Sequence, residues 1–172
     1  MIRLYFACSV DGFIAARDGS VDFLTPYHSP ELGFDRFISQ ISVVVMGRRT
    51  YETLLMFGVG AWPYGTTRGI VLSSNDIKSH FLNVERMNIS PTALRDRLQA
   101  ANLEGDVWVE GGRTMGAFLA AGLVDRIEQH VVPVILGDGI PMFGGLDTAI
   151  PLHTIETRVF TNEVIKHTYA RL

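Results

Sequence analysis

The sequence contains a single cysteine, no apolar run long enough to cross a membrane and no excess of positive charge. Cys8 alone excludes an internal disulfide and a cysteine-based zinc cluster, and its apolar surroundings predict a buried, inert thiol. The net charge of −3 argues against nucleic acid as a general partner. Asp11-Gly12 interrupts the apolar N-terminus before a signal-peptide core forms, so we expect a cytoplasmic protein without a membrane partner.

Two further absences concern bound ligands. No Gly-Lys-Ser/Thr sequence occurs, which counts against ATP hydrolysis, and the G-x-G-x-x-G dinucleotide fingerprint is also missing. His28 and His130 have no metal-ligand partners at suitable spacing, so we expect no metal site and a structural or solvated role for both.

The composition and the order of elements indicate the fold class. The 172 residues are 47% hydrophobic and 19% charged, as in a globular protein, and their number suits one domain covering 1–172. Strand and helix patterns alternate and end in a hairpin, which predicts an α/β fold with a mixed, mostly parallel sheet of about eight strands, covered on both faces. We expect strands at 2–10, 42–46, 68–72, 84–87, 107–109 and 126–136, a hairpin of 154–160 with 164–171, and loops at 21–30 and 58–67. We expect helices beginning at Ser29-Pro30-Glu31, after Gly47, at Ser90-Pro91-Thr92 and at Gly111-Gly112, the last ending near Ala121.

The segment 106–119 has the pattern of a buried strand that turns through glycines into a helix. Its apolar run, Val107 to Val109, is followed at once by Gly111-Gly112 and a helical pattern. The unpaired N–H groups at the start of such a helix, together with the helix dipole, favour an anion such as phosphate. The alternative interpretation is a glycine-rich turn that binds nothing.

Polar groups able to bind phosphate follow three of the expected strands: Gly47-Arg48-Arg49-Thr50, Ser73-Ser74 and Gly111-Gly112-Arg113-Thr114. Open α/β sheets bind ligands outside the carboxyl ends of their strands. A dinucleotide with a pyrophosphate and an additional ribose phosphate requires this set of groups. An arginine after a strand is usually a solvated surface residue, but three such junctions in one short chain favour nucleotide binding.

Five motifs occur in the order found in the dihydrofolate-reductase-like superfamily: Ser9-Val-Asp-Gly-Phe-Ile-Ala15, Met46-Gly-Arg-Arg-Thr-Tyr-Glu52, Leu72-Ser-Ser74, Gly111-Gly112 and Val132-Pro-Val-Ile-Leu-Gly137. Over its whole length the chain resembles the branch that contains the reductase domain of the bacterial riboflavin-biosynthesis deaminase-reductase and its stand-alone relatives. The resemblance implies a dihydrofolate-reductase-like three-layer α/β/α fold and an NADPH site. The resemblance implies Arg48, Ser73 and Ser74 at the adenosine 2′-phosphate, and Ala7 and Ile14 beside the nicotinamide. The residues it implies at the pyrophosphate are Arg49, Thr50, Gly111, Gly112, Arg113 and Thr114. Gly47 and Leu72 are further cofactor-binding residues that it implies.

Two departures from the riboflavin-type pattern bear on the substrate. Phe13 stands where these domains usually have a lysine, a group suited to a phosphorylated sugar. The zinc deaminase half is missing, because there is no His-x-Glu with a Pro-Cys-x-x-Cys partner. The chain is therefore expected to be a reductase-type domain alone.

Reduction of a C=N bond also requires a proton, and three carboxylates are candidate donors. The resemblance points to Glu31, in the helix before the Met-Gly-Arg strand, and we expect Asp35 one turn later on the same face. Glu110 directly precedes the glycines and is expected to face the crevice. Each has a structural alternative: acids in a first helical turn complement the dipole, and Glu110 would bond its own turn. Asp11 is expected to cap its own turn.

Three aromatic residues, Phe57, Trp62 and Tyr64, follow the second junction and would either stack on a flat heterocycle or pack in the loop. We expect an NADPH-dependent reductase of a small pteridine- or pyrimidine-type or imine substrate, resembling 5-amino-6-(5-phosphoribosylamino)uracil reductase. The alternatives are a dihydrofolate reductase-like activity, a non-catalytic NADPH-binding module and, less favoured without a metal-binding carboxylate cluster, a nucleotide-dependent transferase. A homodimer is expected because 131–136 is apolar and relatives with this fold pair there.

Overall fold

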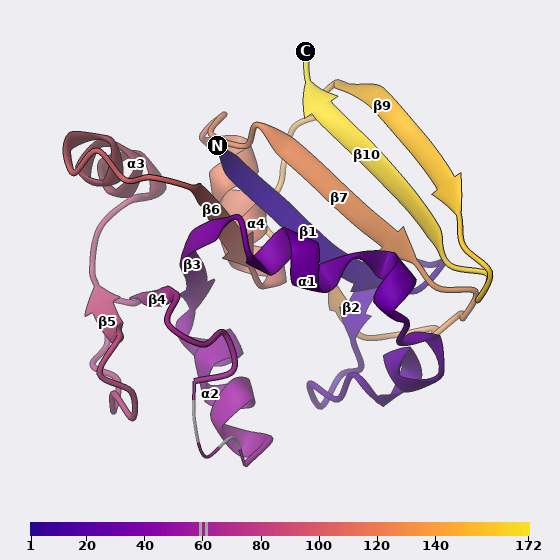
Figure 1. The fold of residues 1–172 in the computed structure, drawn as a ribbon, viewed down its shortest axis with the longest axis horizontal. Helices are drawn as coiled ribbons and strands as arrows, with labels where there is room; N and C mark the ends of the chain where they lie inside the picture. Colours follow the sequence, from indigo (N-terminus) through magenta and orange to yellow (C-terminus); the bar gives the residue numbers. More distant parts are fainter. Residues whose placement is uncertain (59, 61) are drawn as a thin grey trace.

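The computed structural model describes residues 1–58, 60 and 62–172, so positions 59 and 61 of the expected 58–67 loop lie outside the described residues. Its centre is an eight-stranded sheet in the order β5-β4-β3-β6-β1-β7-β10-β9 (Figure 1). The strands are β1 Ile2–Cys8, β3 Ile41–Gly47, β4 Arg68–Leu72, β5 Val84–Met87, β6 Asp106–Glu110, β7 Arg126–Val131, β9 Leu152–Val159 and β10 Ile165–Arg171. Two short strands, β2 Phe13–Ala15 and β8 Ile140–Pro141, pair separately.

The sheet is parallel from β5 to β7, and β10 then pairs antiparallel with both β7 and β9. This arrangement confirms the predicted mixed, mostly parallel sheet with a C-terminal antiparallel hairpin. The connections between parallel strands carry the helices α2 Arg48–Met56, α3 Pro91–Ala100 and α4 Gly112–Ala120, and a shorter helix, α1 Phe34–Ile38, precedes β3.

The helices cover both faces of the sheet because neighbouring side chains of a strand point to opposite sides. On one face, Val45 of β3 belongs to a core cluster with α3 and α4. On the other face, Val44 packs in a cluster with Phe37 of α1 and Tyr51 of α2. In Figure 1, α1 crosses in front of the sheet and α4 lies behind it. The predicted three-layer architecture is therefore confirmed.

Gly33 interrupts the helix expected to begin at Ser29-Pro30-Glu31. The Ser29 hydroxyl accepts a hydrogen bond from the Glu31 N–H at 3.2 Å, as a helix N-cap does, but only one 3-10 turn follows, Pro30–Leu32. Gly33 then has a left-handed conformation with φ of 78°, and α1 begins after it. The expectation that Glu31 and Asp35 share one helical face was therefore wrong.

Two expected boundaries also differ from the structure. The strand expected at 126–136 ends at Val131, because Pro133 has no N–H to donate to a neighbouring strand and Val134 N bonds Val132 O within the turn. The loop expected at 21–30 contains a 3-10 helix, Asp22–Tyr27. The homodimer stays a prediction. It was based on the apolar segment 131–136, of which only Val131 belongs to a strand of the structure.

Asp11 bonds a distant loop in addition to its own turn, where Ser9 is a hydrogen-bond partner. Its carboxylate accepts hydrogen bonds from the N–H groups of Leu136 at 3.1 Å and Gly137 at 2.7 Å. The loop after β7 is thereby fixed beside the turn after β1. Cys8 is buried, as predicted, and its sulfur accepts a hydrogen bond from Gln129 at 3.2 Å.

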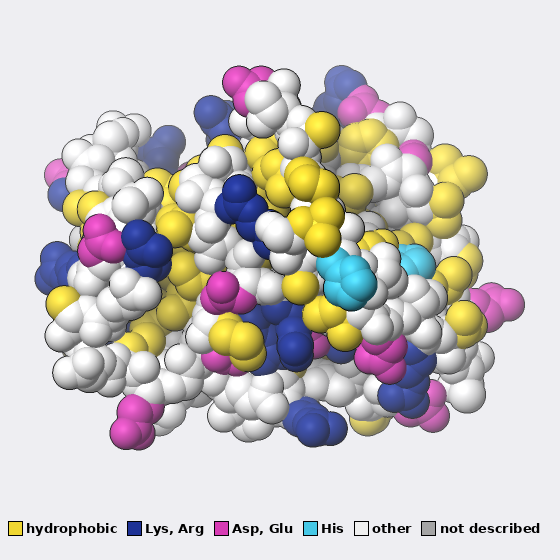
Figure 2. Space-filling view, turned by 90° about the horizontal axis from the view of Figure 1, so that it is seen from above, with side chains coloured by type: hydrophobic (Ala, Val, Ile, Leu, Met, Phe, Trp, Pro, Cys, Tyr) yellow, Lys and Arg dark blue, Asp and Glu magenta, His cyan; other side chains and the backbone are white. Residues whose placement is uncertain are grey.

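The outer surface carries charges of both signs. On the face drawn in Figure 2, dark-blue and magenta side chains are interspersed among polar and hydrophobic ones. Within the described ranges, no helix has the length and apolar character that crossing a bilayer requires.

Candidate active site

The three predicted phosphate junctions lie side by side at one edge of the sheet. Gly47, at the end of β3, is in register with Leu72 at the end of β4. On the other side of β3, Met46 is in register with Glu110 at the end of β6. The carboxyl ends of β4, β3 and β6 are therefore neighbours, and one extended ligand can contact all three.

The two glycine junctions pack directly against each other. A Cβ atom added to Gly111 would clash with Thr50 Oγ1, and one added to Gly47 would lie 2.9 Å from Thr114 Oγ1. Gly111 also has a φ of 87°, which side-chain-bearing residues rarely adopt. The glycines thus permit a close approach of the turns that start α2 and α4.

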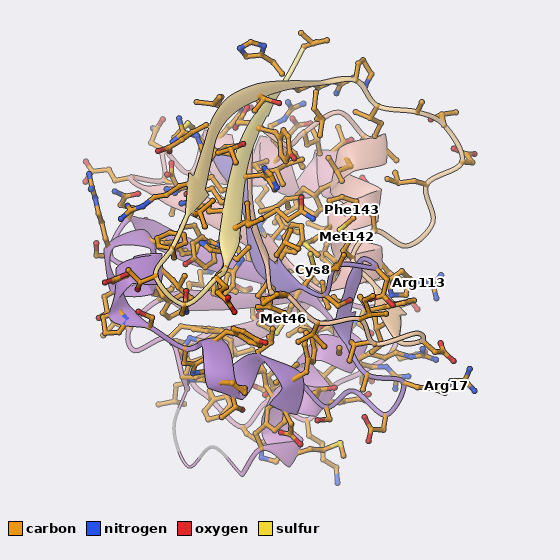
Figure 3. The ribbon with its side chains drawn as sticks, turned by 90° about the vertical axis from the view of Figure 1, so that its right-hand side faces the viewer. Cys8, Arg17, Met46, Arg113, Met142 and Phe143 are labelled. Atoms are coloured by element: carbon orange, nitrogen blue, oxygen red, sulfur yellow. The ribbon has the colours of Figure 1, made fainter. Side chains whose placement is uncertain are left out.

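The start of each of these helices has features suited to an anion. Neither α2 nor α4 has a side-chain hydrogen bond at its N-cap, so first-turn N–H groups are left for another acceptor. Arg48 and Arg49 are exposed, and Arg48 pairs with Glu52 at 3.4 Å. Arg113 is also exposed, and Figure 3 shows its side chain extending outward at the same margin as Arg17.

The serines after β4 differ in their surroundings. The Ser73 hydroxyl donates to Asn75 O at 2.7 Å and accepts from Asn75 N at 3.0 Å. Its hydrogen bonds are therefore used within its own turn, whereas Ser74 is exposed. The strand-end residues together fit the phosphates of a dinucleotide, with Ser74 the more accessible hydroxyl.

A pocket of about 450 Å³ lies over the adjacent strands β1 and β7, on the face that carries α1. Ala7, predicted beside a nicotinamide, is one of its lining residues. Ile14, the other residue predicted there, packs against the core cluster on the opposite face. The pocket is lined by Tyr5, Ala7, Leu24, Tyr27, His28, Ser29, Pro30, Leu32, Phe34, Asp35, His130, Val132 and Val164.

The structure separates the two acids predicted before β3. Asp35, in the first turn of α1, lines the pocket. Glu31 is exposed and accepts a hydrogen bond from the Thr161 hydroxyl at 2.9 Å, in the turn between β9 and β10. Of this pair, Asp35 is therefore the carboxylate placed to contact a ligand.

Glu110 lies at the end of β6 in an enclosed position and is not among the residues that line the pocket. Because Val109 is in register with Leu4, Glu110 projects to the same face as Tyr5. Burial raises the pKa of Glu110 to about 7, and the hydrogen bond from the Tyr64 hydroxyl, 3.2 Å from both carboxyl oxygens, opposes this shift. Glu110 is thus close to half-protonated near neutral pH.

The loop aromatics take three different places. Trp62 is buried, and its indole N–H donates to Thr67 O at 2.8 Å, as the packing interpretation implied. Phe57 is exposed. Tyr64 contacts Glu110 and packs edge-on to Trp108, with ring centroids 5.1 Å apart. Tyr64 therefore supports the carboxyl group at the strand end.

Two histidines that were expected to have structural or solvated roles, His28 and His130, line the pocket, and His130 is the buried one. It is 2% exposed, so the solvated role is wrong, and neither ring nitrogen has a hydrogen-bond partner in good geometry. Burial, followed by the charge of Lys166, lowers the pKa of His130 to about 4, although the Phe6 and Leu32 carbonyls oppose the shift. The imidazole is therefore neutral at physiological pH.

Tyr5, Tyr27 and Phe34 were also not predicted as pocket residues. A signal was present for the strand residues: polar groups alternate on one face of β1, at Arg3 and Tyr5, and on one face of β7, at Glu128 and His130. In β1, whose other residues are apolar, such alternation indicates that one face packs against polar partners or a ligand. The signal is weaker in β7, because Gln129 places a polar group on the opposite face.

Comparison with known proteins is consistent with this geometry. The family model described as "RibD C-terminal domain" matches residues 1–166. The chain belongs to this family. The uncharacterized protein YwjB of Bacillus subtilis is 30% identical over 166 residues, covering 95% of this chain and 94% of YwjB. The riboflavin biosynthesis protein RibD of Mycobacterium tuberculosis is 31% identical over 143 residues, covering 77% of this chain but 42% of RibD, so the chain spans less than half of that relative.

Solved structures share the fold. A putative riboflavin biosynthesis protein from Shewanella sp. PV-4 has a TM-score of 0.89 and 27% identity, covering 99% of this chain and 98% of that one. Dihydrofolate reductase from Enterococcus faecalis, in complex with NADP(H) and RAB-propyl, has a TM-score of 0.67 and 21% identity, covering 99% of this chain and 96% of that one. The predicted resemblance is thus confirmed, and the chain is a reductase-type domain of the RibD family.

Proposed function

We propose that the protein is an NADPH-dependent reductase of a small pteridine- or pyrimidine-type heterocycle, acting on a C=N or related bond. One observation carries the proposal: β4, β3, β6, β1 and β7 are consecutive in the sheet. The first three strands end in groups suited to phosphates, and the next two form the floor of the pocket. A dinucleotide lying across these ends would bring its reactive ring to Ala7, at the boundary of the two regions.

The residues of this chain divide between binding and proton transfer. Arg48 and Ser74 would hold the 2′-phosphate, and the starts of α2 and α4 would hold the pyrophosphate. When bound, NADPH supplies the hydride. The substrate carbon gains that hydride, and its nitrogen gains a proton.

Glu110 is the proposed source of the proton. Its pKa of about 7 keeps a large fraction protonated at neutral pH, which suits a general acid. The Tyr64 hydroxyl, already placed against both carboxyl oxygens, would stabilise the carboxylate left after transfer. Asp35, on the pocket wall, would orient the substrate.

The test is substrate-dependent oxidation of NADPH, followed by its absorbance, with a dihydropterin and an aminopyrimidine as substrates. We expect turnover by the wild-type protein and a loss of about a hundredfold or more in kcat for Glu110→Gln. Full activity of Glu110→Gln would remove Glu110 from the mechanism. Oxidation without dependence on an added substrate would contradict the reductase assignment.

A second candidate is a non-catalytic NADPH-binding module. One observation favours this candidate. Glu31, the proton donor that the family resemblance suggests, accepts a hydrogen bond from Thr161 and does not line the pocket. Binding of NADPH without turnover of either substrate class would support this candidate.

A further inference from the structure

The described residues that line the pocket over β1 and β7 include the carboxylate of Asp35 and no lysine or arginine. Two cations lie near the Tyr5 ring, and both pair with Glu128. Lys166 is 5.7 Å from the ring centroid and 2.8 Å from the carboxylate, and Arg3 is 2.5 Å from the carboxylate. A bound phosphate is normally held by charge-assisted donors, and here it would instead face the carboxylate of Asp35.

The walls of the pocket suit a flat ring. The rings of Tyr5 and Phe34 have centroids 5.9 Å apart, and Tyr5 stacks on Phe37 at 4.2 Å. The Tyr5 hydroxyl donates to Leu32 O at 3.1 Å, which fixes its ring in place. Aromatic surfaces with few polar groups are typical of sites for small heterocycles.

His130 supplies an unpartnered polar group at the pocket. Its ring lies 4.6 Å from that of Tyr5, and both nitrogens are buried without a hydrogen-bond partner. A neutral imidazole carries one donor and one acceptor, and leaving both unpaired in the interior costs free energy. A ligand that presents the complementary pair, as the edge of an aminopyrimidine ring does, would remove that cost.

We propose that the pocket selects a flat, unphosphorylated heterocycle, with His130 as its hydrogen-bonding contact and Asp35 facing its amino group. The inference rests on the proposed function for the position of the reacting ring. The proposed ligand lacks the phosphoribosyl group that appears in the name of the Thermotoga maritima structural neighbour, a diaminohydroxyphosphoribosylaminopyrimidine deaminase and 5-amino-6-(5-phosphoribosylamino)uracil reductase with 16% identity to this chain.

The test uses a matched pair of ligands, 5-amino-6-ribosylaminouracil and its 5′-phosphate. Each is titrated by calorimetry into the full chain saturated with NADP⁺, which prevents turnover. We expect the unphosphorylated compound to bind at least about tenfold more tightly than the phosphate. Equal or tighter binding of the phosphate, or binding of neither compound, overturns the inference. Saturation by NADP⁺ is measured first, and its failure would instead contradict the proposed function.

Asp35→Asn tests the charge argument directly. It removes the negative charge at an exposed position, so we expect it to reduce the preference for the unphosphorylated compound by at least about threefold. A change in general packing would weaken both ligands alike and leave this ratio unaltered. An unchanged ratio would therefore exclude Asp35 from the selection.

His130→Phe keeps a planar ring and removes the two nitrogens. We expect binding of the unphosphorylated compound to weaken about five- to tenfold, the effect of one lost hydrogen bond, with NADP⁺ affinity unchanged. His167→Phe, at a partly buried position of β10 outside the pocket lining, is the matched control and is expected to bind as wild type. Wild-type binding by His130→Phe would remove His130 from the site.

Discussion

Two features of the surroundings of Glu110 set the pKa of its carboxyl group. Burial raises its pKa, and the hydrogen bond from Tyr64 holds it lower than burial alone would. Tyr64 is in turn enclosed, and its own pKa is raised by burial and by the nearby carboxylate. The hydroxyl therefore stays protonated and remains a donor to Glu110.

Replacing Tyr64 by Phe is expected to move the pH profile of turnover. An acid that must be protonated gives activity below its pKa and loses it above, so wild-type kcat/KM should fall as the pH rises through about 7. Tyr64→Phe removes the contact that lowers the pKa of Glu110, so the falling limb should move to higher pH. A limb that stays in place, or moves down, would contradict this pairing.

Residue identities alone indicated part of the site. The glycines, Arg48 and Glu110 follow strand patterns directly, so their place at the sheet edge was predictable. The partner of Glu110 was not, because Tyr64 lies 46 residues earlier in the chain. His130 was missed because its surroundings come from β1, from the 3-10 turn Pro30–Leu32 and from the β9-β10 turn, which no local pattern relates to β7.

The turns that begin α2 and α4 form one packed element at the end of β3 and β6. Gly111 is the residue on which this packing depends most, because it combines a positive φ with contact to Thr50. Gly137 has a similar φ of 76°, but nothing lies within 4 Å of a Cβ added there. Substituting alanine at Gly137 therefore measures the free-energy cost of the backbone conformation alone, whereas substitution at Gly111 adds the cost of the steric clash.

Gly111→Ala is expected to lower the free energy of unfolding by about 3 kcal/mol, and Gly137→Ala by about 1 kcal/mol. The first change adds a clash with Thr50 to the strain that both share. Urea unfolding of the two variants measures the difference. Equal losses would mean that the turns do not pack as closely as the structure indicates.

Element boundaries were predictable where a local signal sets them. Ser90 caps α3, accepting from Ala93 N at 3.2 Å, and Pro91 begins it, as the sequence indicated. Gly33 and Pro133 decided two of the boundaries that differed from the prediction. Their effects depend on whether neighbouring segments offer hydrogen-bond partners, which the linear pattern does not contain.

At the scale of the whole molecule, two buried titratable groups oppose each other in the pH dependence of stability. The pKa of His130 falls to about 4 in the folded protein, so unfolded chains bind more protons below pH 6.5 and stability rises with pH from about 4 to 6.5. The pKa of Glu110 rises to about 7, so folded chains bind more protons and stability falls with pH from 4.5 to about 7. Each effect is on the order of 3 kcal/mol, and they largely cancel.

Single substitutions should reveal the two opposing effects of pH on the free energy of unfolding. Glu110→Gln leaves the effect of His130, so the free energy of unfolding should increase between pH 4 and 6.5 more steeply than in wild type. His130→Phe leaves the effect of Glu110, so the free energy of unfolding of this variant should decrease from pH 4 to 6.5. Denaturant unfolding at a series of pH values measures both, and parallel curves for all three proteins would contradict the assigned shifts.

The fold class was predictable because alternating strands and helices with a terminal hairpin have few arrangements. The site was predictable only in part. The strand order places β6, late in the chain, between β3 and β1, and this insertion brings the phosphate junctions next to the pocket. Long-range pairing of this kind cannot be obtained from local periodicity.

Fluorescence titration with NADPH and NADH tests the central claim most directly, comparing wild type with Arg48→Ala and with Arg95→Ala, a control on α3. We expect wild type and the control to bind NADPH in the micromolar range and NADH at least about tenfold more weakly. Arg48→Ala should lose about tenfold in affinity for NADPH and little for NADH. Equal losses for the two cofactors would contradict the 2′-phosphate assignment, and no binding below the millimolar range would contradict the nucleotide site itself.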